Sequence, residues 1–197
     1  MSLPGRDVGP FEPLVLAMCE KYRYEEMHCK RVADLAGQLF AALADLHGMG
    51  EAEAGLLRHG ALLHDIGHAV HYRAHHRHGE YLVLQDASLG GYPEPERTVL
   101  AYLARAHRKQ RVPKAPGGGG EGRRALRLAA LLRLADGMDH ERTGTARLLA
   151  VDVAPKQITL AVEGIDLQAQ ADLLNRKAAL MKPAFGRKVV WQAGAES

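Results

Sequence analysis

The sequence predicts a mainly α-helical protein that ends in a small ββαβ segment. From Phe11 to about Gly144, leucine, alanine, valine and methionine recur at spacings of three and four residues, which is typical of amphipathic helices. Residues 146–164 instead alternate apolar and polar side chains, which is typical of strands. Apolar residues make up 47% and charged residues 25% of the 197 residues, so the chain is long and apolar enough to bury a core.

The helical part divides at recognisable breaks. The pattern over 14–49 is too long for one helix, and we expect a break between Lys21 and Glu26. A second helix over 51–67 has acidic residues at its start and Gly67 as its stop. Residues 81–107 form two helices around the turn sequence LGGYPEP. The glycine run 117–120 is expected to be a mobile loop, after which 123–140 returns to helix.

The C-terminal part has a different pattern. Two β-branched runs within 146–164 flank a Pro-Lys turn, so we expect a hairpin there. Residues 166–185 return to a helical pattern, and 187–192 form a last strand. We therefore predict two domains, a helical domain over 1–145 and a ββαβ subdomain over 146–197.

Composition argues against several classes of partner. The net charge of +3 and the 5% aromatic content argue against nucleic acid. No apolar stretch reaches the roughly 18 residues of a membrane span, and the N-terminal residues do not resemble a signal peptide. The two cysteines lack CxxC spacing, so reduced thiols and a cytoplasmic location are expected. The sequence leaves open whether the chain forms a homo-oligomer.

The stretch 59–79, HGALLHDIGHAVHYRAHHRHG, holds seven of the eleven histidines. Within it His64 and Asp65 are adjacent, just before Gly67, and near a helix end both side chains can reach one cation. A neutral imidazole with a carboxylate suits Mn, Fe, Co, Ni or Zn, whereas sets of oxygen ligands suit Mg.

Two residues elsewhere extend this pair. Asp136 interrupts a strongly apolar helix, and a buried ionised carboxylate is costly unless it is paired or bound to metal. His28 lies on an amphipathic helix upstream. Together His28, His64, Asp65 and Asp136 would supply four ligands from three helices.

This order, His…His-Asp…Asp, is similar to the signature of the HD superfamily of metal-dependent phosphohydrolases. The segments ALLHDIGHAVHYRAHHRHGEYLV, ERTVLAYLARAHRK and RLAALLRLADGMD, with the β-rich tail, resemble the C-terminal HD-like region of the exopolyphosphatase/guanosine pentaphosphatase family. The resemblance runs from about His28 to Trp191 and implies an HD-type metal-binding helical bundle over 1–145. In that family, polyphosphate cleavage belongs to N-terminal actin-like domains, whose motifs this sequence does not contain.

The resemblance also implies a second metal. Candidate ligands are His78 and His107, with His75 and His76 as alternatives to His78, while His68, His71 and His75 are expected to line the pocket. The cofactor would be one or two divalent ions of Mn, Fe, Co, Ni, Zn or Mg. Asp65 would bridge two ions that activate water for attack on phosphorus, so Asp65 and His64 are the predicted catalytic residues.

The expected substrate is a phosphorylated small molecule. Basic residues near the histidines could hold its phosphate, although a solvated basic loop is an equal alternative; they are Arg73, Arg77, Arg108 and Lys109. The favoured function is a phosphohydrolase acting on a nucleotide, cyclic nucleotide or polyphosphate-like phosphoester. The alternatives are a non-catalytic regulatory module that binds polyphosphate or an alarmone, and a subunit that partners a separate actin-like phosphatase chain.

Overall fold

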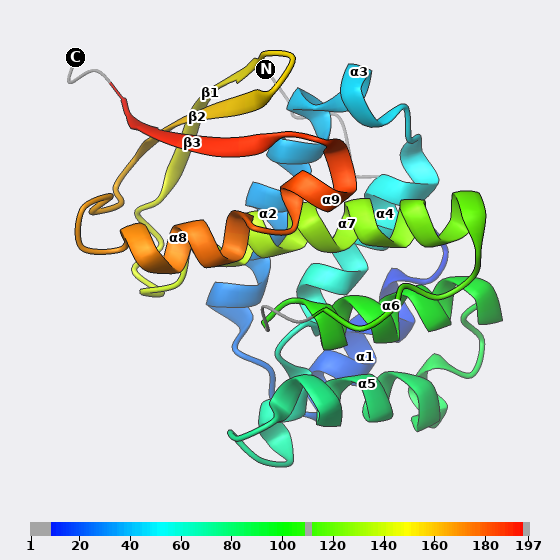
Figure 1. Cartoon of the computed structure of the whole chain (residues 1–197). Coiled ribbons are helices and arrows are strands. Elements are labelled where there is room, and N and C mark those ends of the chain that lie inside the picture. The colour runs from blue at the N-terminus through cyan, green and yellow to red at the C-terminus, as the bar shows by residue number, and fades with distance from the viewer. Residues whose placement is uncertain (1–8, 109–111, 195–197) are drawn as a thin grey trace.

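The computed structural model describes residues 9–108 and 112–194, and it confirms a mainly α-helical fold with one small sheet (Figure 1). The α-helices are α1 Glu12–Lys21, α2 Glu26–Ala42, α3 Ala44–His47, α4 Glu51–Leu63, α5 His75–Gln85, α6 Glu94–Ala106, α7 Gly119–Met138, α8 Ala171–Ala178 and α9 Met181–Phe185. Two 3₁₀ helices are η1 Ile66–Ala69 and η2 Ala87–Leu89, and the strands are β1 Arg147–Val153, β2 Gln157–Glu163 and β3 Lys188–Ala193.

Helix α7 is the centre of the core. It packs against α2, α4, α6, α8 and α9, and every residue from Leu128 to Met138 is buried. A helix that is surrounded on all sides must be apolar nearly all round, and each leucine buried in this way contributes roughly 1.5–3 kcal/mol. Asp136 is an exception to this pattern, and α7 therefore carries a carboxylate into the core. Among residues 9–108 and 112–194, no helix combines the length and apolar character needed to cross a membrane.

The break predicted between Lys21 and Glu26 is confirmed, but two expected boundaries are wrong. Helix α4 ends at Leu63, four residues before Gly67. Gly67 instead permits a close approach, because a Cβ there would lie 2.0 Å from the carbonyl oxygen of His75. The 3₁₀ helix η1 therefore packs directly against the start of α5. Helix α7 begins at Gly119, inside the glycine run that was expected to be a loop.

The C-terminal part has the expected ββαβ order. Strands β1 and β2 form an antiparallel hairpin, and β3 adds in parallel to β2, giving the order β1-β2-β3. A parallel connection needs a crossover, which α8 and α9 provide. In Figure 1 the crossover brings α8, drawn in orange, against α7. The division of the chain into two domains at residue 145 stays a prediction.

Candidate metal centre

The structure brings the four predicted ligands of the first ion together. His28 lies on α2, His64 and Asp65 directly follow α4, and Asp136 lies on α7. The Nε2 atom of His28 is 4.0 Å from Asp65 Oδ2 and 3.8 Å from Asp136 Oδ1. The Nε2 atom of His64 is 3.6 Å and 3.9 Å from the same two oxygens. Two nitrogens and two oxygens, from α2, α7 and the two residues after α4, thus face one another.

The second nitrogen of each histidine fixes the orientation of its ring. His28 Nδ1 donates to Asp139 Oδ2 over 2.8 Å, and His64 Nδ1 donates to the carbonyl oxygen of Ala61 over 2.7 Å. In these tautomers each Nε2 carries a lone pair. Neither buried Nε2 atom has a hydrogen-bond partner among the described residues. Buried polar atoms are rarely left in this state, and histidines held through the other nitrogen are typical of metal ligands. The donor set therefore fits a divalent cation.

A second group of histidines surrounds the other oxygen of Asp65. Asp65 Oδ1 lies 3.3 Å from His75 Nε2, 3.4 Å from His107 Nε2 and 3.5 Å from His68 Nε2. His107 is oriented through Nδ1, which donates to the carbonyl oxygen of Ala104 over 2.8 Å. Asp65 therefore lies between two groups of imidazole nitrogens, and each of its oxygens faces one group.

The pKa shifts of Asp65, Asp136 and His64 favour the forms that bind metal. At His28, burial lowers the pKa, but the hydrogen bond to Asp139 and the charges of Asp136 and Asp65 outweigh it and raise this pKa. Burial raises the pKa of Asp65, but the neighbouring His64 and the hydrogen bonds from other histidines outweigh it and hold this pKa far below its usual range. Burial also raises the pKa of Asp136, and the charges of Lys177 and His64 outweigh it, so that the pKa falls to a low value. Burial lowers the pKa of His64. Ionised carboxylates and a neutral imidazole are the protonation states that metal binding requires.

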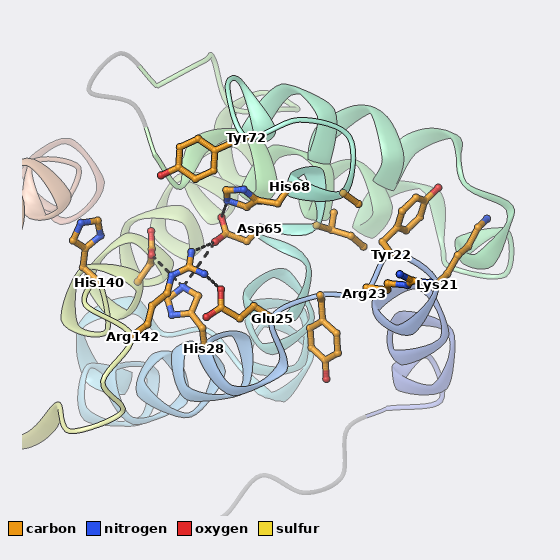
Figure 2. A pocket seen from close by; sticks show the side chains of 14 residues that line it. Lys21, Tyr22, Arg23, Glu25, His28, Asp65, His68, Tyr72, His140 and Arg142 are labelled. Carbon is orange, nitrogen blue, oxygen red and sulfur yellow. Dashed lines mark hydrogen bonds and ion pairs between the residues drawn. The ribbon is translucent and has the colours of Figure 1, made fainter.

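Among the residues that the structure describes, two cationic side chains, Lys177 and Arg142, contact the ligand carboxylates, and the sequence predicted neither contact. Lys177 from α8 donates to Asp136 Oδ2. Arg142, in the loop after α7, donates to Asp65 Oδ2 over 2.9 Å and also pairs with Glu25 (Figure 2). Arg142 has a φ of +57°, a left-handed conformation that is uncommon outside glycine and asparagine. No local motif marks either contact, because Lys177 lies 41 positions from Asp136 and Arg142 lies 77 positions from Asp65 along the chain.

Two adjoining cavities open beside Asp65, with volumes of about 950 Å³ and 320 Å³. The larger cavity is also lined by residues from the end of α1 and the segment after it, which are Lys21, Tyr22, Arg23 and Tyr24, and by Tyr72 between η1 and α5. The smaller cavity is strongly basic, because its lining includes Arg108, Arg133, Arg142, Arg176 and Lys177. Of the four predicted phosphate-binding residues, Arg108 lines the smaller cavity. Arg73 and Arg77 are exposed and line neither cavity, and Lys109 lies outside the described residues.

The structure does not bring His78 into either group of histidines. It is partly exposed on α5 and has no described polar contact with the site. Its alternative His75 lies there instead, at the first residue of α5, while His76 is buried beside it. Of the three histidines expected to line the pocket, His68 and His75 do so, and His71 is exposed outside both cavities.

Comparison with known proteins shows the family of the chain. The model of the family Ppx/GppA phosphatase, domain III, matches residues 12–182. The chain belongs to this family. Relatives of this Ppx/GppA domain include two proteins named guanosine-5'-triphosphate,3'-diphosphate pyrophosphatase. One, from Vibrio cholerae, is 30% identical over 149 residues, which is 73% of this chain and 29% of the relative.

The other, from Aeromonas hydrophila, is 27% identical over 150 residues, which is 74% of this chain and 30% of that relative. A third protein of the same name, from Vibrio campbellii, is 31% identical over 156 residues, which is 77% of this chain and 29% of that relative. The chain thus spans less than a third of the length of these relatives. Their similarity confirms the predicted relation to the Ppx/GppA family.

Proposed function

We propose that this Ppx/GppA domain is a metal-dependent phosphohydrolase of the HD type. The observation that carries the proposal is the position of Asp65, whose Oδ2 faces His28 and His64 while its Oδ1 faces His68, His75 and His107. A bridging carboxylate between two sets of imidazoles suits two transition-metal ions. The orphaned Nε2 atoms of His28 and His64 support the first of these positions.

The residues divide between two ions. His28, His64, Asp65 and Asp136 would hold the first, and the second would take Asp65 with histidines of the other group. When bound, divalent metal supplies Lewis-acid polarisation of phosphoryl oxygens and lowers the pKa of water. The fixed tautomers of His28 and His64 keep their Nε2 lone pairs directed into the site.

The basic cavity would position the phosphate groups of the substrate. Arginines form paired, charge-assisted hydrogen bonds with phosphate oxygens, and Arg108, Arg142 and Arg176 line the cavity beside Asp65. The relatives are named for a pyrophosphatase that acts on a guanosine polyphosphate, which favours a phosphoanhydride or phosphoester of a nucleotide as the substrate here. Cyclic nucleotides and polyphosphate remain in the proposed range.

A screen for phosphate release tests the proposal. The chelator-treated chain would be supplied with Mn, Co, Ni, Zn or Mg and with guanosine polyphosphates, nucleoside monophosphates, cyclic nucleotides or polyphosphate. We expect release with at least one transition metal and its loss in Asp65→Asn, which removes the charge of the bridging ligand. Asp152→Asn, at an exposed position of β1, is the matched control. Metal-loaded wild type that releases no phosphate from any substrate would contradict the proposal.

A second candidate is a regulatory module that binds phosphorylated ligands without turnover. It is favoured by the match to domain III of the family, the region for which the family resemblance predicts no polyphosphate cleavage of its own. This candidate predicts that metal and a nucleotide or polyphosphate bind, measured by calorimetry, while no product forms. A subunit role predicts further that the chain co-purifies with an actin-like phosphatase chain.

A further inference from the structure

A buried lysine of the C-terminal part contacts the candidate metal centre. Lys177 lies near the end of α8 and is 7% exposed, and Asp136 on α7 is 6% exposed. The ammonium of Lys177 donates to Asp136 Oδ2, while Oδ1 of the same carboxylate faces His28 and His64. The two oxygens of Asp136 therefore have separate partners, and the one that faces the histidines stays available to a cation.

The residue after Asp136 leaves room for this contact. A Cβ on Gly137 would lie 3.1 Å from both Cβ and Cγ of Lys177. The absence of a side chain at Gly137 lets the aliphatic stem of Lys177 cross α7 closely and place its ammonium beside Asp136. Gly137 is the next-to-last residue of α7, and within a helix glycine is less favourable than alanine by up to about 1 kcal/mol. Its presence here is explained by the packing of Lys177.

The same region is anchored by further polar contacts. Lys177 Nζ also donates to the carbonyl oxygen of His107 over 3.3 Å, so one ammonium joins Asp136 of the first ligand group to the backbone of His107 in the second. Arg133, one turn before Asp136, donates to the carbonyl oxygens of Arg176 and Lys177. These bonds fix the last turn of α8 on α7.

We propose that Lys177 is a positioning residue for Asp136, and that α8 is therefore a part of the metal centre. This inference rests on the proposed metal site. Lys177 holds Oδ2, prevents rotation of the carboxylate, and leaves Oδ1 as a single directed ligand. Hydrogen-bonded partners of metal ligands usually contribute 10–100-fold in metal affinity.

Cobalt titration of the chelator-treated full chain tests the inference, with the absorption spectrum of bound Co²⁺ as a readout of ligand geometry. Lys177→Met removes the ammonium and keeps the stem, and we expect the Kd for Co²⁺ to rise at least about 10-fold with a changed spectrum. Gly137→Ala should act in the same direction by displacing the Lys177 stem, although alanine itself favours the helix. Lys182→Met, exposed on α9, is the matched control and should leave both readouts unchanged.

Wild type that binds no Co²⁺ would remove the proposed function and this inference together. Wild type that binds Co²⁺, with Kd and spectrum unchanged in folded Lys177→Met, would overturn the role of Lys177 alone. Tighter binding in Lys177→Met would also overturn it, because the lysine would then be a competing cation. If Lys177→Met does not fold, Gly137→Ala decides, and an unchanged affinity and spectrum in that variant would refute the inference.

Discussion

Asp139 connects a metal ligand to the loop that carries Arg142. Its Oδ2 accepts the hydrogen bond from His28 Nδ1 over 2.8 Å, and its Oδ1 accepts one from the backbone N–H of Gly144 over 3.2 Å. Its carbonyl oxygen also accepts from the backbone N–H of Arg142 over 2.9 Å. Asp139 is 2% exposed, so water cannot readily replace either carboxylate contact. One side chain thus orients His28 and shapes the turn behind it.

We expect Asp139→Asn to weaken metal binding. Asparagine has nearly the same shape, but one carboxylate oxygen becomes an amide that only donates. Either His28 or Gly144 then loses its acceptor, and a buried donor without a partner costs about 1–3 kcal/mol of folding stability. Loss of the partner that orients a ligand costs about 10–100-fold in metal affinity, equivalent to about 1.4–2.7 kcal/mol.

Two measurements check this prediction. Titration with Co²⁺ gives the Kd, and urea unfolding of the metal-free chain gives the free energy of unfolding. Asp152→Asn makes the same chemical change on the exposed strand β1 and should alter neither value. A Kd and a free energy of unfolding in Asp139→Asn that both equal those of wild type would show that Asp139 does not orient His28.

Other buried or paired charges give three further expectations. Arg142→Ala should lower kcat/KM for phosphate release by about 10–100-fold, the contribution of a charge-assisted contact. Its affinity for Mn²⁺, measured by calorimetry, should be no weaker than that of wild type, and a weaker affinity would contradict the expectation. Asp136→Ala should destabilise the metal-free chain by about 3–5 kcal/mol in urea, because Lys177 becomes a buried unpaired charge, and adding Lys177→Met should restore most of the loss. Burial lowers the pKa of His59 from 6.5 to about 4. The unfolded chain therefore takes up this proton first as the pH falls, and wild type loses up to about 3 kcal/mol between pH 6.5 and 4; His59→Gln, compared by urea unfolding, should show a flatter dependence, and an equal slope would refute the assignment.

The sequence predicts the fold and the first ligand group because both depend on local signals. Helical periodicity locates the bundle, and alternation locates the hairpin of β1 and β2. A carboxylate on an otherwise apolar helix marks Asp136, since burying an ionised group requires a partner. The adjacent His64 and Asp65 mark a ligand pair near a helix end, although the predicted stop at Gly67 lies four residues after the observed end of α4. The structure then brings these residues together from α2, from the two positions after α4 and from α7.

The second histidine group depends on a backbone approach that periodicity does not report. Gly67 lets η1 lie against the first turn of α5, and Ala74 before that turn has a φ of +59°. This geometry places His75, rather than His78, beside Asp65. A choice among neighbouring histidines depends on where α5 begins, and boundaries are the part of a helix that sequence locates least well. Lys177 was missed for another reason, since its partner Asp136 lies 41 residues away.

The two cations at the candidate centre differ in a way that bears on how it would work. Lys177 contacts Asp136 at Oδ2, whereas Oδ1 of that carboxylate faces His28 and His64. Arg142 holds Asp65 by Oδ2, the oxygen that faces those histidines (Figure 2). The side chain of Arg142 is 39% exposed, against 8% for that of Lys177. Arg142 lines both cavities. If Asp65 held an ion through this oxygen, the guanidinium of Arg142 would be available to an incoming phosphate there, while Lys177 would still hold Asp136.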